Sequence, residues 1–321
     1  MCGCSGASLD HILAAEASPT VHSPGAAGFS SRDDEPTGRP VVVGSVNDLD
    51  APRQTREPTG RLLRLARYLR ELGLEPLVVT RIGDDVQGRQ VLGIFRNWGL
   101  DASGVQVDPR LPTGGPRDGP RPGGAFEALD PKSATEAISA TSAALIYQAA
   151  SKVRSEGNAA ALRHIQGSTG LPFFVDIDVE ETWPESSGPR SVMLGAKWLR
   201  IGAIQLSPLL RPSGVRRRTT IAEAARAIQR RFALDVVVVD HRRLPLLAVS
   251  DRQIAEGPEG RCDVDALDVR ARDAATAALI AGVTVGLSLS TLMTRAAEFA
   301  LAFGLSRPPA GLGGPLRTRP L

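Results

Sequence analysis

Cysteine is scarce in this sequence, and its scarcity excludes a fold stabilised by disulfides. The chain has three cysteines, Cys2, Cys4 and Cys262, among 321 residues. An odd and sparse set of this kind fits a protein of the reducing cytoplasm. Cys2 and Cys4 form a C-x-C pair, but no histidine or cysteine follows at the spacing of zinc ligands, so we interpret this stretch as a frayed terminus.

The sequence also has no large excess of positive or of negative charge. The 38 basic and 35 acidic residues leave a formal net charge of +3, and the basic residues are spread along the chain. A nucleic-acid surface needs such residues clustered on one face, so the sequence predicts no nucleic-acid partner. Lysine occurs only at positions 132, 152 and 197, a bias towards arginine that we interpret as a property of the coding sequence.

No apolar run in the sequence has the features of a membrane span. The stretch 274–294 carries no charge over a length that could cross a bilayer. It is interrupted by glycine, serine and threonine, however, and it lacks an aromatic belt. We therefore predict two buried helices, broken near GVTVGLS, and no membrane contact. The apolar HILAA segment near the start is too short for the core of a signal peptide.

What the sequence does contain is a regular alternation of apolar runs and helical patterns. RPVVVGSV is a β-branched run typical of a buried parallel strand, and TGRLLRLARYLRELG follows with leucines at helical spacing and Gly73 as its stop. The pair recurs as EPLVVTRI and DVQGRQVLGIFRNWG. Later strands are predicted in AALIY, PFFVDI, KWLRI, DVVVVD and PLLAV, and later helices in AAALRHI, TIAEAARAIQRRFA, DAATAALIAG and LMTRAAEFALAFG. This alternation of strands and helices predicts a doubly wound α/β domain.

Three segments fall outside this alternation. Residues 1–38 are rich in Ala, Ser, Gly and Pro and are predicted to be a disordered tail, and residues 309–321 to be a flexible one. Residues 112–124 contain too much proline and glycine for a regular element and are predicted to be an irregular loop. The α/β domain is therefore expected over residues 39–308.

Taken in order, these segments resemble the PfkB/ribokinase family of ATP-dependent sugar kinases, in particular its fructokinase-like members. VVVGSVNDLD resembles the first strand, FFVDIDVEETWP the Asp-Val-Asn-Leu-Arg segment, and RAAEFALAFGLSRP the closing helix; the stretch from ARYLRELG to PRLPTG is the best match. The resemblance implies a Rossmann-type three-layer α/β/α sandwich with a small β lid over the sugar. Because proline cannot donate to a β ladder, residues 112–124 predict that this lid is reduced or absent.

The resemblance implies phosphorylation of a sugar hydroxyl by ATP, with Mg²⁺ as the metal. That reaction needs a carboxylate beside the hydroxyl as its base. Asp273 matches the position of the family's catalytic aspartate and is expected just before a helix. An aspartate at that place also stabilises the helix dipole, and both interpretations stay open.

The phosphate cradle departs from the family pattern. In DVRARDAATAALIAG the two cradle glycines correspond to Arg270 and Arg272, with Ala271 between them. Glycine permits unusual backbone torsions and a close approach to phosphate. Two arginines therefore predict steric exclusion or a reshaped loop, although their charge also allows a cradle rebuilt from side chains.

The nucleotide and metal positions are altered as well. The glutamate of the family's Asn-x-x-Glu motif, which supports Mg²⁺, corresponds to the neutral Gln205. Asp178 and Glu180 replace the Asn and Arg of the Asp-Val-Asn-Leu-Arg segment, and added acid there should repel phosphates. The glycine-containing turn near the nucleotide reads DHRRLP and begins with Asp240.

The sugar positions are partly kept. Asn47 and Asp48 lie near the place where ribokinase-like members bind sugar hydroxyls. Of the Gly-Gly-x-x-x-Asn signature, Gly60 is retained and Arg64 replaces the asparagine.

An intact scaffold with altered ligand motifs predicts a PfkB-type carbohydrate kinase homologue that is weak or inactive. Its ligand would be a sugar or a sugar-like molecule, a protein partner would be an alternative, and it would be a monomer or a homodimer. The alternative is an active kinase that needs ATP and Mg²⁺, with Asp273 as base and an arginine-built cradle. A third hypothesis is an α/β protein whose resemblance has no functional content.

Overall fold

The fold is built on one nine-stranded sheet. The structure, a computed structural model, describes residues 38–46, 60–114, 124–149, 156–177, 193, 195–210, 220–240, 246–258 and 269–304. The strands are β1 (Arg39–Val43), β2 (Leu77–Gly83), β3 (Val105–Asp108), β4 (Ala143–Ala149), β5 (Phe173–Ile177), β6 (Ala196–Gly202), β7 (Val236–Asp240), β8 (Leu247–Ser250) and β9 (Ile254–Glu256). They lie in the order β3-β2-β1-β4-β5-β6-β7-β8-β9. Pairing is parallel from β3 to β7, and β8 and β9 add antiparallel strands at one edge.

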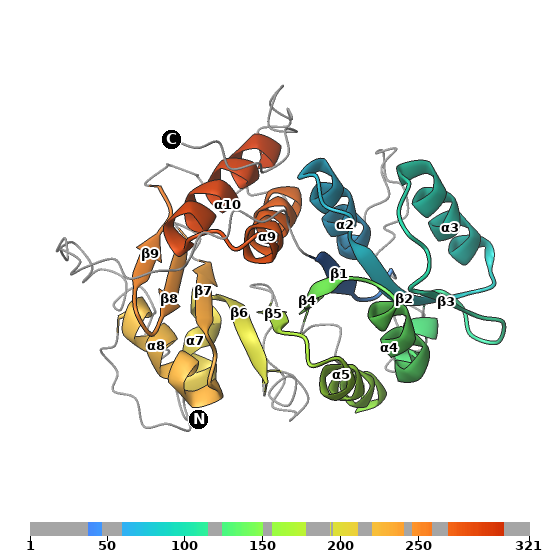
Figure 1. Ribbon diagram of the computed structural model, residues 1–321, viewed down its shortest axis with the longest axis horizontal. Coiled ribbons are helices and arrows are strands. Elements are labelled where there is room, and N and C mark those ends of the chain that lie inside the picture. Colours follow the sequence, from blue (N-terminus) through green and yellow to red (C-terminus); the bar gives the residue numbers. More distant parts are fainter. Residues whose placement is uncertain are drawn as a thin grey trace, which may run out of the picture.

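Helices cover both faces of this sheet. They are α2 (Arg61–Glu71), α3 (Val86–Trp98), η1 (Ala125–Ala128), α4 (Pro131–Ser139), α5 (Glu156–Thr169), α7 (Ala203–Leu210), α8 (Ile221–Phe232), α9 (Val269–Thr284) and α10 (Leu289–Gly304). α2, α3, α9 and α10 lie on one face, and α4, α5, α7 and α8 lie on the other (Figure 1). Each face has its own apolar core. The predicted three-layer α/β/α sandwich is therefore confirmed.

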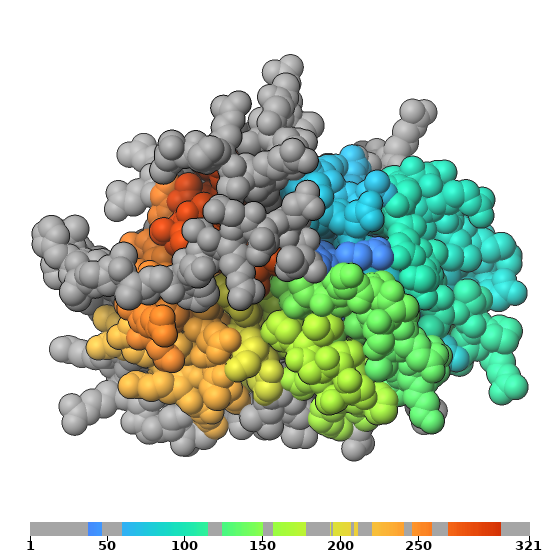
Figure 2. Space-filling view, in the orientation of Figure 1, coloured from blue at the N-terminus to red at the C-terminus, as the bar shows by residue number. Residues whose placement is uncertain are grey.

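The chain crosses the sheet from one end to the other. Strands β1 to β3 form one end and β6 to β9 the other, so the blue-to-cyan and the orange parts of the chain lie apart (Figure 2). From β1 the chain adds β2 and β3 on one side of β1, and it then returns to add β4 and the later strands on the other side. The strand order therefore reverses between β1 and β4. In sheets of this kind, ligands bind beyond the carboxyl ends of the strands near such a reversal.

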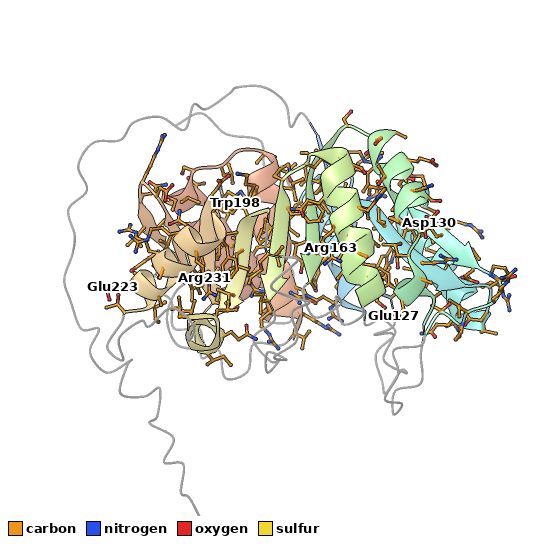
Figure 3. The ribbon with its side chains drawn as sticks, turned by 90° about the horizontal axis from the view of Figure 1, so that it is seen from below. Glu127, Asp130, Arg163, Trp198, Glu223 and Arg231 are labelled. Atoms are coloured by element: carbon orange, nitrogen blue, oxygen red, sulfur yellow. The ribbon has the colours of Figure 1, made fainter. Side chains whose placement is uncertain are left out.

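Several boundaries follow the signals in the sequence. α3 ends at Gly99, which adopts the left-handed conformation with φ +60° that glycine allows. α8 begins with the predicted capping box, in which Thr220 and Glu223 bond each other's backbone (Figure 3). The uncharged stretch 274–294 is divided between α9 and α10, as predicted. In the part of the chain that the structure describes, no helix is both long and apolar enough to cross a membrane.

Five of the described elements were not predicted from the sequence: β3, β9, η1, α4 and α7. α4 has a clear local signal, because the Asp130 side chain accepts hydrogen bonds from the Lys132 and Ser133 N–H groups and Pro131 is its first residue (Figure 3). Of the loop predicted over 112–124, residues 115–123 lie outside the described part. So do residues 1–37 of the first predicted tail, the whole of the second tail, 309–321, and the last four residues of the predicted domain, 305–308. Every strand that is described belongs to the one sheet, so none forms a lid.

The RIGDDVQGR segment joins β2 to α3 through one carboxylate. Asp85 accepts hydrogen bonds at Oδ1 from the Gly88 N–H (2.7 Å) and the Thr113 hydroxyl (2.6 Å), and at Oδ2 from the Thr113 N–H (2.8 Å). The Thr113 hydroxyl in turn accepts from the Gly83 N–H at 2.9 Å. Partial burial acts to raise the pKa of Asp85, but the bonds from Thr113 and Gly88 outweigh it and hold that pKa below 3.8, its ordinary value. Asp85 therefore caps α3 and fixes the chain beyond β3 at the same time.

We expect Asp85→Ala to lower the free energy of unfolding in urea by about 2 kcal/mol, because it removes a helix cap and two further hydrogen bonds. Asp84→Ala is the matched control, since its ion pair with Arg89 is 62% exposed on both sides. That control should change stability by less than about 0.5 kcal/mol. Because the folded pKa of Asp85 is lowered, its contribution is complete above about pH 4 and is lost as the pH falls through the folded pKa. Equal effects of the two variants would contradict this role.

Candidate functional site

Charged side chains gather at the carboxyl edge of the sheet, on the face covered by α2 and α9. Asp176 is the fourth residue of β5, and Arg200 is the fifth residue of β6. Asp240 ends β7. Arg61 is the first residue of α2 and Arg64 is the fourth, and Asp273 lies in α9. We call these six residues the charge chain.

Asp273 is held by two arginines at the α2 end of the charge chain. Its Oδ2 accepts a hydrogen bond from Arg64 Nε at 2.7 Å, and its Oδ1 forms an ion pair with Arg61 Nε at 3.1 Å. The Asp273 side chain is only 2% exposed. The expectation that Asp273 precedes its helix is wrong, because α9 begins at Val269 and Asp273 is its fifth residue. The helix starts earlier because the arginines at 270 and 272 favour it, where glycines would not.

The middle of the charge chain is deeply buried. Arg61 Nη2 donates to Asp176 Oδ2 at 2.6 Å, and Arg200 Nη1 donates to the same oxygen at 3.1 Å. Arg200 Nη2 donates to Asp240 Oδ2. The Tyr147 hydroxyl adds a hydrogen bond to Asp176 at 3.1 Å. The side chains of Asp176 and Arg200 are 0% and 2% exposed, so each neutralises a charge that water cannot reach.

Burial and ion pairing act in opposite directions on these groups. Burial would raise the pKa of Asp176, but Arg200 and Arg61, with hydrogen bonds from Arg200 and Tyr147, hold that pKa below its ordinary value. For Asp273, burial dominates and raises the pKa of the carboxyl, although Arg61 and Arg64 oppose it. Burial, with the nearby Asp273, raises the pKa of Tyr68 to about 12. Ionisation is therefore favoured at Asp176 and disfavoured at Asp273.

The structure brings together two residues that the sequence predicted separately. Arg64, at a sugar position, bonds directly to Asp273, the predicted base. Gly60 is the N-cap of α2 and so places Arg61 and Arg64 in that helix. Asn47 and Asp48, the other predicted sugar residues, lie outside the described part of the chain.

The predicted cradle is the first turn of α9. Arg270, Ala271 and Arg272 are helical, and Ala233 is the only non-glycine residue with a positive φ in the part of the chain that the structure describes. The torsions that would demand glycine are therefore absent here, and the expected reshaping of the loop takes the form of a helical turn. Ala271 is buried, and the two arginines are half-buried on either side of it.

The described residues do not fit a Mg²⁺ site. Gln205 lies in α7, is buried, and offers a neutral amide where the family has a carboxylate. Asp176 and Asp240 are already paired with Arg200, and no described group of three His, Cys, Asp or Glu residues could hold a metal ion. Magnesium prefers carboxylate oxygens that are not engaged by cations. Asp178, the other predicted nucleotide-side acid, lies outside the described residues.

Three members of the charge chain are absent from the sequence-based prediction: Arg61, Asp176 and Arg200. A signal for two of them exists, because Asp176 in FFVDI and Arg200 in WLRI are each the one charge within an apolar run. Buried strands tolerate such charges only in pairs. Asp176 and Arg200 are direct partners in the parallel register of β5 and β6. Arg61 has no comparable signal, since an arginine at the start of an amphipathic helix is ordinarily exposed.

The fold and the position of this edge define an α/β protein of the ribokinase fold. No family model matches the sequence, and no curated protein matches it. Among solved structures, a PfkB protein from Polaromonas sp. JS666 has a TM-score of 0.65 at 20% identity, over 85% of this chain and 97% of its own. A putative ribokinase II from E. coli, in complex with ATP and Mg²⁺, has a TM-score of 0.62 at 16% identity, over 86% and 96%. A fructokinase from Vibrio cholerae O395, bound to fructose, ADP and calcium, has a TM-score of 0.58 at 18% identity, over 87% and 96%.

Proposed function

We propose that this protein is a PfkB-type sugar kinase homologue in which phosphoryl transfer is weak or absent. The observation that supports this most is the double contact on Asp273, whose two oxygens face Arg61 and Arg64. A catalytic base must reach the proton of the attacking hydroxyl. A buried carboxylate with a guanidinium on each oxygen cannot do so unless the arginines move.

The phosphate and metal positions support the same proposal. Cβ atoms at Arg270 and Arg272 replace the open backbone of a glycine cradle, and Gln205 replaces a metal-supporting carboxylate. Solved proteins of this fold hold fructose or ATP, so we propose a sugar or a sugar-like molecule as the ligand of this chain. A protein partner, and assembly as a monomer or a homodimer, stay part of the proposal, as does a domain over residues 39–308.

One observation favours the alternative of an active kinase. Arg270 and Arg272 lie in the first turn of α9, where the positive end of the helix dipole also attracts anions. A cradle made of these side chains would serve ATP if Asp273 were released from its arginines.

The measurement that separates the two is release of ADP from Mg-ATP over a panel of hexoses, pentoses and nucleosides. We expect no sugar-dependent turnover above background and no thermal shift with Mg-ATP, because neither the base nor the metal site is competent. Asp273→Asn, run alongside, should then release ADP at the same background rate as the unaltered protein. Sugar-dependent turnover that disappears in Asp273→Asn would overturn the proposal and establish the active kinase.

A further inference from the structure

The two arginines that hold Asp273 are presented by a single turn of α2. Arg61 and Arg64 are three residues apart, and residues at that spacing lie on the same face of a helix. Arg64 Nε donates a hydrogen bond to one oxygen of Asp273 at 2.7 Å, and Arg61 Nε lies 3.1 Å from the other oxygen in an ion pair without a hydrogen bond. Two guanidiniums converging on one carboxylate recognise that group well, whether it belongs to the protein or to a ligand.

The arginines lie nearer to solvent than the carboxylate they hold. The side chains of Arg61 and Arg64 are 12% and 16% exposed, while Asp273 is 2% exposed. An anion arriving from solvent would therefore meet the guanidiniums before it met Asp273. Arg64 also occupies the position where the resemblance expects an asparagine that binds the sugar, so the arginines stand at the ligand's expected place.

Arg61 is anchored independently of Asp273. Its Nη2 donates to Asp176 at 2.6 Å, and Asp176 is fixed by Arg200 and by the Tyr147 hydroxyl. If Asp273 gave up its contacts, Arg61 would keep its position. A second carboxylate or phosphate could then take the place of Asp273 without rebuilding the pair.

The surroundings favour an anion rather than a neutral group. Two helix N-termini, those of α2 and α9, lie beside each other here, and each carries a partial positive charge. Arg270 adds a third guanidinium on the same face of α9 as Asp273, since it lies three residues before it in that helix. A neutral sugar would exclude water from these guanidiniums without supplying an opposite charge, and such desolvation of a charged group costs free energy.

From this geometry, and resting on the proposed function, we infer that the ligand of this site carries a carboxylate or a phosphate group. That group binds Arg61 and Arg64 in place of the Asp273 carboxylate, which acts as an internal competitor for the arginine pair. Sugar acids and sugar phosphates share the required chemistry, whereas the corresponding neutral sugars lack it.

The test uses the full chain, calorimetric titration and matched pairs of probes. D-gluconate is compared with D-glucose, D-fructose 6-phosphate with D-fructose, and inorganic phosphate is included alone. We expect at least one charged probe to bind and neither neutral sugar to bind. Tighter binding of D-gluconate would indicate a sugar acid as the ligand, and tighter binding of D-fructose 6-phosphate a sugar phosphate. Arg64→Gln should weaken that binding about tenfold or more, because a charge-assisted hydrogen bond is lost. Arg67→Gln, which removes a charge from the exposed side of the same helix, should leave it unchanged.

Asp273→Asn gives the result that only an internal competitor predicts. Asparagine keeps the shape but not the charge, so charged probes should bind about tenfold more tightly. Weaker binding in this variant, equal binding of neutral and charged probes, or no binding of any charged probe by the unaltered protein and by Asp273→Asn would each overturn the inference. If Asp273→Asn fails to fold, the comparison of Arg64→Gln with Arg67→Gln decides alone. ADP release, recorded on the same samples with Mg-ATP, reports separately on the proposed loss of phosphoryl transfer.

Discussion

Arg200→Met is expected to lower the free energy of unfolding by about 3–5 kcal/mol, the largest effect of any single change considered. Arg200 forms ion pairs with both Asp176 and Asp240, and its side chain is 2% exposed. Burial disfavours its charge, yet the two carboxylates raise the pKa of the guanidinium further above its ordinary value. Methionine fills similar space but leaves two carboxylates, Asp176 and Asp240, with Arg61 as the one charge-chain arginine that still contacts Asp176, and removing one partner of a buried ion-pair network costs this much.

Urea unfolding measures the effect, and two further variants show its cause. Arg295→Met removes an arginine from a half-exposed pair with Glu298 and should cost less than about 0.5 kcal/mol. Asp176→Asn combined with Arg200→Met should recover part of the loss, because one of the two carboxylates that lose Arg200 is then neutral. If Arg200→Met lowers the free energy of unfolding by less than about 1 kcal/mol, water reaches this part of the charge chain.

Gly88→Ala and Gly93→Ala, two changes in the same helix, should have opposite signs. A Cβ at Gly88 would overlap the carbonyl oxygen of Gly83 and lie 2.9 Å from the Thr113 hydroxyl, so the junction held by Asp85 must move. We expect a loss of about 3 kcal/mol from such overpacking. A Cβ at Gly93 meets no atom within 4 Å, and the lower entropy of the unfolded chain should stabilise the protein by about 0.5–1 kcal/mol.

The same urea titrations separate this pair. A loss for both variants would mean that α3 is sensitive to any added methyl group, and that the close approach at Gly88 is not the cause. A neutral Gly88→Ala would mean that β2 and α3 can separate by several tenths of an ångström without cost.

The scaffold could be predicted from the sequence because its signals are local. RPVVVGSV and DVVVVD are apolar runs that only a buried strand explains, and Gly99 ends α3 through a torsion that favours glycine. α4 was missed because it is short and its apolar positions, Ala134 and Ile138, are few. β3 and β9 are short edge strands, whose alternation is too brief to distinguish from a loop.

The site could be predicted only in part because its partners are distant in the sequence. Asp273 was recognisable from its neighbours, but nothing near it indicates that Arg61 and Arg64 would bind it. The pairing of Asp176 with Arg200 depends on the register of two parallel strands, which a single strand does not reveal. Positions such as Arg270, where a familiar motif is altered, show that something changed but not what replaced it.

The charge chain also constrains the order of events while the protein is being made. Arg64 and Asp273 are 209 residues apart, so the helix that carries the arginines leaves the ribosome long before their partner exists. Because the ribosome adds roughly 5–20 residues per second, Asp273 is synthesised about 10–40 seconds after Arg64. Through that interval the Arg64 guanidinium lacks Asp273, while Asp176, the other partner of Arg61, and Arg200 are made earlier, as β5 and β6 are synthesised. The last helices therefore close the contact between α2 and α9, and a nascent chain that stops before residue 273 should expose the amino end of α2 to proteases.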